Sequence, residues 1–448
     1  MTTTSPPVPQ PEPEPTLVSA GQRLADTPGD AAAWIARAVA LARAGDHAGV
    51  ARGHRRALAV QPTSGDAWSG LGAALSAQGR HRPALAAIRR ALALDPAHGH
   101  AAFHLTTALL RAGDFDACRI ALERLIHLQP AVRSHPWGRA QLRLHEGDYE
   151  RGFADYEARC WLPDYARYRI HRGPRWDGGP LDGKIVMITL EQGFGDTLMM
   201  ARYLPMLKAR GARRVIVECR DELRRLFAGM EGVDAFIAEN AAPTPIYHVH
   251  SPLMSLPLRF GTTAATVPPP VRLAIPDEAR AKAARLVPGP GGARKVGIVW
   301  SGNSAFPDNR FRAVGLDRFL PLLEVPGVTL FSLQKGPLEA ELDRLGPAAP
   351  IVPLGPHLED FADTAAVLER LDLVIMTDSS VAHLAGSLGT PVWNLVQHVP
   401  YWVYGRSGPT TPWYPSMRLY RQGADEDWAP VFEAVRRDLT DLAARHRG

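Results

Sequence analysis

A 34-residue period organises the first third of the chain. Four glycines recur at this interval: Gly45, Gly79, Gly113 and Gly147. Three prolines keep the same spacing: Pro62, Pro96 and Pro130. A glycine can turn the chain between two helices and a proline can end the pair, so a fixed period of this length predicts stacked helical hairpins. We expect these hairpins to occupy residues 18–163.

The residue types within one period resemble the tetratricopeptide repeat. In the best copy, large, small and helix-ending residues stand where that repeat places them: Trp68, Leu71, Gly72, Ala84, Ala91 and Pro96. We expect three clear repeats and a weaker fourth from Gly147, forming an α-solenoid with a concave face for a peptide or another domain. Alternatively, the solenoid only supports the next domain or mediates dimerisation.

Composition limits the kind of protein. With 448 residues, 46% hydrophobic and 22% charged, the chain predicts several globular domains. The net charge of +5 comes without a dense basic run, so we expect no nucleic-acid partner. Three separated cysteines argue against a disulfide framework and fit a reducing compartment. There is no apolar run long enough for a transmembrane segment and no signal-peptide pattern, so we expect a cytoplasmic protein.

Residues 1–17 are rich in Thr, Pro and Glu and predict a disordered tail.

After a connector at 167–183, the hydrophobic pattern changes to that of alternating strands and helices. Residues 184–190 predict a strand, 197–207 a helix, and 214–219 a second strand, before a helix that Asp221 caps. This βαβα order is the start of a doubly wound parallel sheet, which we assign to residues 164–275. Gly193 and Gly195, in the loop after the first strand, let the backbone pass close to a substrate. Asp196 stands at the start of the helix, where it is either a functional carboxylate or an N-cap.

A second sheet is expected within residues 276–448. A strand at 295–300 is followed by Ser301 and Asn303 and then by a polar loop that carries Arg310. We expect helices near 316–323 and 358–370, with a strand at 328–333 between them and Lys335 after it. The carboxyl ends of parallel strands meet at one edge of a sheet. We therefore expect Ser301, Lys335 and the Asp378 side chain to converge on one crevice.

The run from 371 to 395 predicts a strand, a polar turn, a helix and another strand. Asp378, Ser379 and Ser380 form the turn, and Gly389 ends the helix. A helix N-terminus beyond a strand's carboxyl end suits a phosphate group. The alternative is an ordinary βα unit in which Asp378 is a cap and His383 a buried core residue.

Two short clusters suggest metal binding only weakly. His248 and His250 stand on the same side of an expected strand, but no acidic or cysteine partner is near them in sequence. Asp425 and Asp427 form an Asp-x-Asp motif just before a terminal helix, where a cap is the better explanation. We therefore expect no metal site and no cofactor.

Four stretches of the second half, taken together and in this order, are similar to GT-B glycosyltransferases of the ADP-heptose:lipopolysaccharide heptosyltransferase family. They are EQGFGDTLMMARYLP, GIVWSGN, FSLQKG and DLVIMTDSSVAHLAGSLGTPVW. The likeness covers about 184–442 and is closest to the branch with N-terminal tetratricopeptide repeats. It implies an α plus α/β chain, with the α-solenoid followed by a GT-B module of two Rossmann-like domains and an active site between them.

The resemblance also implies roles for particular residues. Asp196 matches the proposed general base of the family, and Lys335 or Arg310 matches the basic residue that faces the nucleotide diphosphate. The nucleotide sugar is expected to contact Asp378, Ser379, Ser380 and His383, with Ser301 and Asn303 completing the donor site. Heptosyltransferases often have Asp-Thr-Gly where this chain has Asp-Ser-Ser, which leaves the identity of the donor open.

These observations predict a cytoplasmic, inverting, metal-independent glycosyltransferase that moves a sugar from a nucleotide-sugar donor to an acceptor hydroxyl. The repeats would recruit a protein acceptor, such as flagellin, on their concave face. In a second version the enzyme acts on a surface glycan or lipopolysaccharide. A third alternative is a non-catalytic repeat scaffold with a degenerate transferase module.

Overall fold

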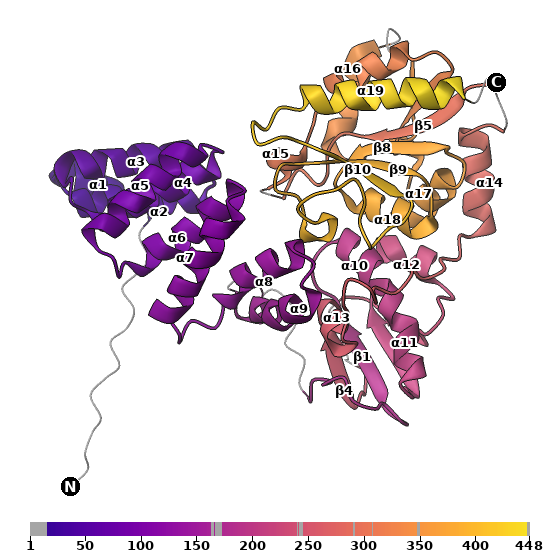
Figure 1. Cartoon of the computed structure of the whole chain (residues 1–448), viewed down its shortest axis with the longest axis horizontal. Coiled ribbons are helices and arrows are strands. Elements are labelled where there is room, and N and C mark those ends of the chain that lie inside the picture. The colour runs from indigo at the N-terminus through magenta and orange to yellow at the C-terminus, as the bar shows by residue number, and fades with distance from the viewer. Residues whose placement is uncertain are drawn as a thin grey trace. The chain divides into compact units, whose positions relative to one another are not determined.

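The computed structural model describes residues 16–162, 165, 173–239, 241, 245–289, 292–306, 308–346 and 350–445. The chain divides into two compact units: the first ends at Gly138 and the second begins at Arg139. The first contains helices and the second contains two β-sheets (Figure 1). Residues 1–15 of the expected tail and 167–172 of the expected connector lie outside the described residues. The expected domain boundaries at 163 and 275 stay predictions.

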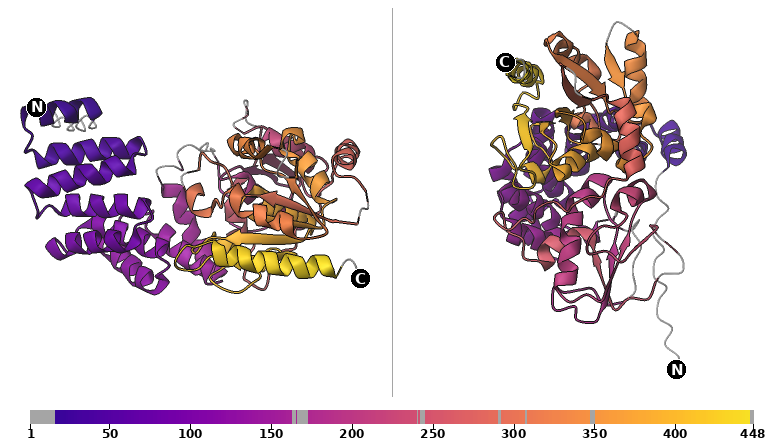
Figure 2. Two further views of the ribbon diagram at one scale, coloured as in Figure 1. Left: turned by 90° about the horizontal axis from the view of Figure 1, so that it is seen from above. Right: turned by 90° about the vertical axis from the view of Figure 1, so that its right-hand side faces the viewer.

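Helical hairpins with a constant period form the first unit, as predicted, and their helices stack in successive rows (Figure 2). Its helices are α1 (Leu17–Asp26), α2 (Ala31–Arg43), α3 (His47–Val60), α4 (Gly65–Ala77), α5 (His81–Leu94), α6 (Gly99–Arg111) and α7 (Phe115–Leu128). Helix α8 (Pro136–His145) begins in this unit and ends in the second, where α9 (Tyr149–Tyr156) follows it. The weaker fourth repeat is therefore largely part of the unit that holds the sheets.

Glycine is needed in the repeats for two separate reasons. Each hairpin turn has a glycine in the left-handed region, with φ between 73° and 80° at Gly45, Gly79, Gly113 and Gly147. Within a helix, Gly72 allows α4 to approach α5 closely. A Cβ atom on Gly72 would lie 2.3 Å from Ile88 Cγ1 and 3.0 Å from the Ala84 carbonyl oxygen. The periodic glycines thus serve the hairpin turns, whereas Gly72 serves the packing of one helix pair.

The first sheet has four parallel strands in the order β3-β2-β1-β4 among the described residues. The strands are β1 (Ile185–Thr189), β2 (Arg214–Glu218), β3 (Ala235–Ile237) and β4 (Val249–Pro252). The helices that accompany them are α10 (Phe194–Met200), α11 (Leu204–Ala209), α12 (Asp221–Phe227) and α13 (Leu256–Arg259). The chain winds outward from β1 to β3 and then returns to the other side of β1. The carboxyl ends of β1 and β4 therefore form a topological switch point, where ligands bind in such sheets.

The second sheet has six parallel strands in the order β10-β9-β8-β5-β6-β7, again counted over the described residues. The strands are β5 (Arg294–Val299), β6 (Val328–Ser332), β7 (Ile351–Pro353), β8 (Leu373–Thr377), β9 (Val392–Val396) and β10 (Met417–Arg421). Its helices are α14 (Asp277–Leu286), α15 (Asn309–Arg312), α16 (Ala340–Leu345), α17 (Phe361–Leu368), α18 (Ser380–Leu388) and α19 (Ala429–Ala444). The switch point here lies between β5 and β8.

One apolar core supports this second sheet. Its buried members include Trp300 after β5, Ile375 on β8 and Val435 on α19, so the terminal helix covers one face of the sheet. Figure 1 shows α19, in yellow, running along that face. The predicted fold class, helical repeats followed by two parallel-sheet α/β domains, is confirmed.

Several predicted elements differ in extent. The helix expected at 197–207 begins at Phe194 and passes through a 3-10 turn at Ala201–Tyr203, because Pro205 interrupts the hydrogen-bond ladder. The helix expected near 316–323 is two 3-10 turns, and the one expected at 358–370 is only Phe361–Leu368. Asp221 is the first residue of α12 and not its cap, which is Arg220. In the part of the chain that the structure describes, no helix has the length and apolar character needed to cross a bilayer.

Replacing Gly72 by Ala is expected to destabilise the repeats by about 1–3 kcal/mol, because the new methyl group overpacks the contact with Ile88. The matched control is Gly21→Ala in α1, where a Cβ would meet nothing within 4 Å. That change is expected to be neutral or to stabilise by up to about 1 kcal/mol. Urea unfolding followed by circular dichroism measures both, and equal effects would contradict the packing argument.

Candidate active site

The loop between β1 and α10 presents Asp196 at the switch point of the first sheet. Gln192 has a left-handed backbone, with φ 69°, which is unusual outside glycine. The chain then enters α10 with Gly193 as the N-cap, and the Gly193 N–H donates to Asp196 Oδ2 at 3.1 Å. The prediction that Asp196 stands at the helix start is confirmed. It is not the N-cap residue, although its carboxylate accepts the N-cap N–H.

The second sheet domain completes the surroundings of Asp196. The Tyr401 hydroxyl donates to Asp196 Oδ1 at 2.8 Å. Helix α10 also packs on α18, and a Cβ on Gly195 would lie 2.7 Å from His383 Cδ2. Gly195 therefore allows the His383 ring to approach the loop that carries Asp196. The sequence predicted Gly193, Gly195, Asp196 and His383 as site residues, and the structure brings them together.

Burial is the largest influence on the pKa values of Asp196 and His383. Burial raises the pKa of Asp196 above its ordinary value, and His383, Tyr401 and the Gly193 N–H only partly offset this rise. Burial likewise lowers the pKa of His383, even though the Asp378 and Asp196 carboxylates act in the opposite direction. A carboxylate with a raised pKa beside a neutral imidazole is the combination expected of a site that moves protons.

Asp378 and Ser379 follow β8 at the switch point of the second sheet. The buried Tyr404 hydroxyl donates to Asp378 Oδ1 at 2.9 Å, and Arg312 Nη1 lies 3.7 Å from Asp378 Oδ2. Ser379 is the N-cap of α18, but its side chain makes no capping hydrogen bond. Its Oγ is buried and has no hydrogen-bond partner among the described residues. Ser380 is the first residue of α18. A polar atom left unpaired at a helix N-terminus is a position for a ligand oxygen.

Ser301 connects β5 to this cluster. The Asn309 side-chain amide donates to Ser301 Oγ at 2.9 Å, and Arg312 Nε donates to Asn309 Oδ1 at 3.1 Å. The Gln334 Oε1 atom accepts both the Trp300 and Ser301 N–H groups, at 3.1 and 3.0 Å, which ties the end of β6 to the end of β5. Arg312, Asn309 and Gln334 were not predicted. The available signal was the position of Gln334 just after β6, and that of Asn309 and Arg312 in the polar stretch that follows β5.

Three predicted donor-site residues point elsewhere. Lys335 follows β6, as expected, but its Nζ donates to the Gly355 carbonyl oxygen at 2.9 Å and its side chain is about half exposed, at 52%. The Arg310 guanidinium lies over the ring of its neighbour Phe311, and the Asn303 side chain accepts the Ala305 N–H within its own turn. The basic side chain that reaches Asp378 is therefore Arg312, two residues after Arg310.

A fully buried ion pair supports the loop before α10. Arg159 and Glu191 are both 1% exposed, and two bonds join them: Arg159 Nη2 to Glu191 Oε1 at 2.6 Å, and Nε to Oε2 at 3.0 Å. Glu191 also accepts the Met254 N–H at 2.9 Å. Since Arg159 follows α9 and Glu191 directly precedes Gln192, this pair joins the last helical repeat to the glycine loop.

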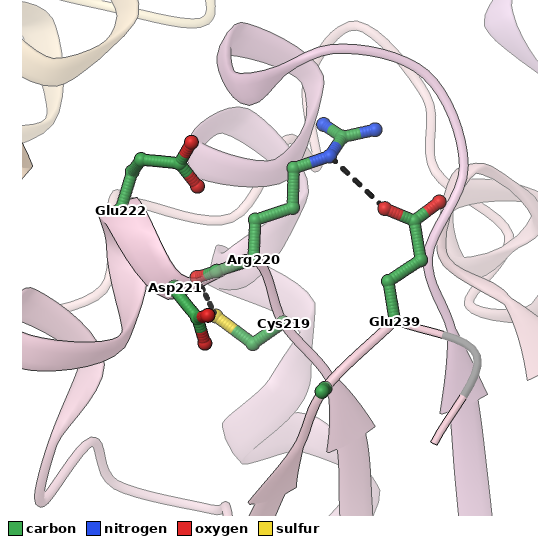
Figure 3. A pocket seen from close by; sticks show the side chains of 6 residues that line it. Cys219, Arg220, Asp221, Glu222 and Glu239 are labelled. Atoms are coloured by element: carbon green, nitrogen blue, oxygen red, sulfur yellow. Dashed lines mark hydrogen bonds and ion pairs between the residues drawn. The ribbon is translucent and has the colours of Figure 1, made fainter. Parts of the chain in front are cut away.

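A shallow cleft of about 270 Å³ opens at the carboxyl ends of β2 and β3, beside that loop (Figure 3). Arg220 donates from Nε to Glu239 at 3.2 Å and from Nη2 to the Gln192 carbonyl oxygen at 2.8 Å. Burial raises the pKa of Cys219, which also lines the cleft, to about 12, which disfavours the reactive thiolate form. The cleft matters to the site because Arg220, which lines it, holds the backbone of Gln192.

The two clusters considered for metal binding have other partners. His248 Nδ1 accepts the Ile185 N–H at 2.9 Å, and the Asp427 carboxylate accepts the Ala429 N–H at 3.0 Å at the start of α19. Over the described ranges, no group of three or more His, Cys, Asp or Glu side chains is arranged to hold a metal ion.

The architecture defines a class: a chain of helical hairpin repeats followed by two parallel-sheet α/β domains. Residues 75–137 match the family model described as the tetratricopeptide repeat. A curated relative, Protein FlbA of Caulobacter vibrioides, is 31% identical over 341 residues, which cover 69% of this chain and 55% of the relative. The chain thus spans about half the length of the curated relative that it matches.

Solved structures of the resembled kinds are also similar to this chain. The Escherichia coli ADP-heptose lipopolysaccharide heptosyltransferase II is 15% identical, with 59% of this chain and 100% of that chain covered and a TM-score of 0.44. A glycosyl transferase of family 9 from Veillonella parvula is 14% identical, with coverages of 55% and 88% and a TM-score of 0.42. An O-GlcNAc transferase from Thermobaculum terrenum is 16% identical, with coverages of 93% and 91% and a TM-score of 0.34.

Replacing Glu191 by Gln is expected to destabilise the second unit by up to about 3–5 kcal/mol, because it removes the fully buried carboxylate partner of Arg159 and leaves only the partly buried Glu157 as its counter-charge. The matched control is Glu324→Gln, which breaks an exposed pair with Arg436 at 3.2 Å. That change is expected to cost less than about 1 kcal/mol. Urea unfolding monitored by tryptophan fluorescence compares the two, and similar losses would refute a special role for the buried pair.

Replacing Asp196 by Asn is expected to raise the thermal unfolding midpoint at pH 7. The folded state favours the protonated form of Asp196, so its stability is fully present below the ordinary carboxyl pKa and declines as the pH rises through the raised folded pKa. Asn imitates the neutral form, so the gain is expected to vanish below about pH 4.

Asp363 provides a control of opposite sign. Although burial opposes it, Lys282, the Glu359 N–H and Arg225 hold the pKa of Asp363 below its ordinary value. Its contribution is therefore present at neutral pH and is lost as the pH falls. Asp363→Asn is expected to lower the unfolding midpoint at pH 7. A lower midpoint for Asp196→Asn as well would contradict the raised pKa of Asp196.

Proposed function

We propose that the second unit is a glycosyltransferase that moves a sugar from a nucleotide-diphosphate donor to an acceptor hydroxyl. The observation that carries this proposal is the buried, unpartnered Ser379 Oγ at the N-terminus of α18, a helix whose His383 ring lies against the loop that carries Asp196, a carboxylate of raised pKa from the other sheet domain. The N-terminus of α18 with Ser379 suits the leaving phosphate, and the Asp196 carboxylate suits the proton of the attacking hydroxyl.

Helix α18 and Arg312 would hold the diphosphate. The N-terminus of a helix supplies N–H donors and the positive end of its dipole. Arg312 adds a guanidinium that Asn309 and Asp378 already orient. Positive charge and fixed donors favour the departing nucleoside diphosphate in the transition state more than the intact donor.

Asp196 would act as the general base. In an inverting transfer, the acceptor oxygen attacks the anomeric carbon, the bond from that carbon to the phosphate oxygen breaks, and the hydroxyl proton passes to the Asp196 carboxylate. The raised pKa makes Asp196 a stronger proton acceptor than an ordinary aspartate. This mechanism needs no resident cofactor.

The repeats would bring the acceptor. A stack of helical hairpins offers an extended surface that suits a peptide, and we propose a protein acceptor on the concave face. Transfer to a surface glycan, with the repeats serving assembly, is the second version of this function. A repeat scaffold without catalysis is the alternative from a different class.

A thermal-shift screen tests the donor site directly. The panel consists of nucleoside diphosphates and nucleotide sugars of several bases and sugars. A compound present at 100 times its Kd adds about 2.7 kcal/mol of stability, which is readily detected. The proposal predicts that at least one nucleotide sugar and its nucleoside diphosphate shift the wild-type protein.

Catalysis is tested with the donor found in this way. Release of the nucleoside diphosphate is measured with water as acceptor, and Asp196→Asn is expected to lower the rate about 100-fold or more while the thermal shift remains. Donor binding with equal rates in both proteins would refute Asp196 as the base. No shift with any compound, in protein shown to be folded, would favour the scaffold.

A further inference from the structure

One loop of the second sheet domain supplies a hydroxyl group to each of three candidate site residues. We call residues 400–414, between β9 and β10, the tyrosine loop. The Tyr401 hydroxyl donates to Asp196 Oδ1 at 2.8 Å, and the Tyr404 hydroxyl donates to Asp378 Oδ1 at 2.9 Å. The Tyr414 hydroxyl lies 3.0 Å from His383 Nδ1. Three tyrosine hydroxyls from one segment thus each contact a different candidate site residue, which indicates that the segment holds these residues in place.

The tyrosine loop is anchored by two tryptophans that are fully buried, Trp402 and Trp413. Trp413 Nε1 donates to the Tyr149 hydroxyl of α9 at 2.8 Å. The Trp402 ring meets the rings of Phe153 and Tyr156, also on α9, edge to face at 5.6 and 6.4 Å. Aromatic contacts of this geometry add stability beyond their buried area.

The first sheet domain also contacts the tyrosine loop, through Arg202. Arg202, which is buried between α10 and α11, donates from Nη1 and Nη2 to the Trp413 carbonyl oxygen at 3.1 and 3.2 Å. Its guanidinium also lies over the Trp413 and Tyr414 rings, 5.0 and 5.1 Å from their centroids. The loop is thus held by the last repeat helix and by both sheet domains, which gives its hydroxyls defined positions.

We propose that the tyrosine loop is a positioning element, in which Tyr401 orients Asp196 and stabilises its ionised form while Tyr404 and Tyr414 orient Asp378 and His383. The proposal rests on the function proposed above, because that function assigns roles to Asp196, Asp378 and His383. Tyr401 touches no reacting atom in this scheme and acts through Asp196. A hydroxyl that donates to a buried carboxylate favours the charged form that a general base needs.

Other ionisable groups also surround Asp196, so the effect of Tyr401 must be separated from theirs. They are His383 on α18, Asp378 after β8, Tyr156 on α9 and Tyr414 of the tyrosine loop, and their interactions with Asp196 are electrostatic. The change Tyr401→Phe removes one oxygen atom and leaves these groups in place. Any shift in the ionisation of Asp196 then reports the lost hydroxyl.

The test measures the ionisation of Asp196 without any substrate. The full chain is labelled with 13C at the aspartate carboxyl carbons and titrated by NMR, and the Asp196 signal is the one missing from Asp196→Asn. A hydrogen bond to a charged group corresponds to a shift of about 1–2 pKa units. Tyr401→Phe is therefore expected to raise the Asp196 midpoint by about one unit.

Tyr420→Phe is the matched control. Its hydroxyl donates to Asp438 at 2.9 Å, away from the candidate site, so the change should move the Asp438 signal and leave Asp196 unmoved. An unchanged Asp196 midpoint in folded Tyr401→Phe would overturn the proposal, as would an equal shift of the Asp196 midpoint in Tyr420→Phe. Failure of the nucleotide-sugar screen would instead refute the proposed function, and this titration would still report whether Tyr401 governs Asp196.

Discussion

The close approach of α10 to α18 is the constraint on which the arrangement of the site depends. Gly195 has no side chain, and a Cβ there would lie 2.7 Å from the His383 ring. Contacts that short do not persist in folded proteins, so any other residue would displace the His383 ring or push the two helices apart. Each helix begins at the switch point of its own sheet. Their contact therefore brings together two ligand-binding edges that parallel sheets would otherwise form separately.

The site also buries charge in a way that a core alone would not favour. Arg159 and Glu191 pair with each other out of contact with water, and Asp196 is held with its pKa raised by burial. Gln192 adopts a left-handed backbone between them, supported by the bond from Arg220. The buried ion pair, the raised carboxyl pKa and the left-handed Gln192 depart from local rules, as is common where structure serves chemistry.

Much of this arrangement was predictable from local rules. The glycine period predicted the hairpin turns, and the apolar runs predicted β1, β5, β6 and β8 within a residue or two. Polar residues after those strands pointed to Asp196, Ser301 and Ser379. Lys335, after β6, and Arg310, in the polar loop after β5, have the position and the positive charge that the family resemblance predicts for a diphosphate contact. The structure instead directs Arg312 at Asp378, since side-chain direction in a short helix such as α15 depends on its packing.

The sequence alone determined the repeat period, the order of strands and the glycines that permit tight turns, because these depend on neighbours along the chain. Tertiary structure decided which hydroxyl meets which carboxylate and how far burial raises the pKa of Asp196. The tyrosine loop has no periodicity that would mark it, and Tyr401 lies 205 positions from Asp196. Contacts over such separations are set by the packing of whole domains, and local propensity does not encode them.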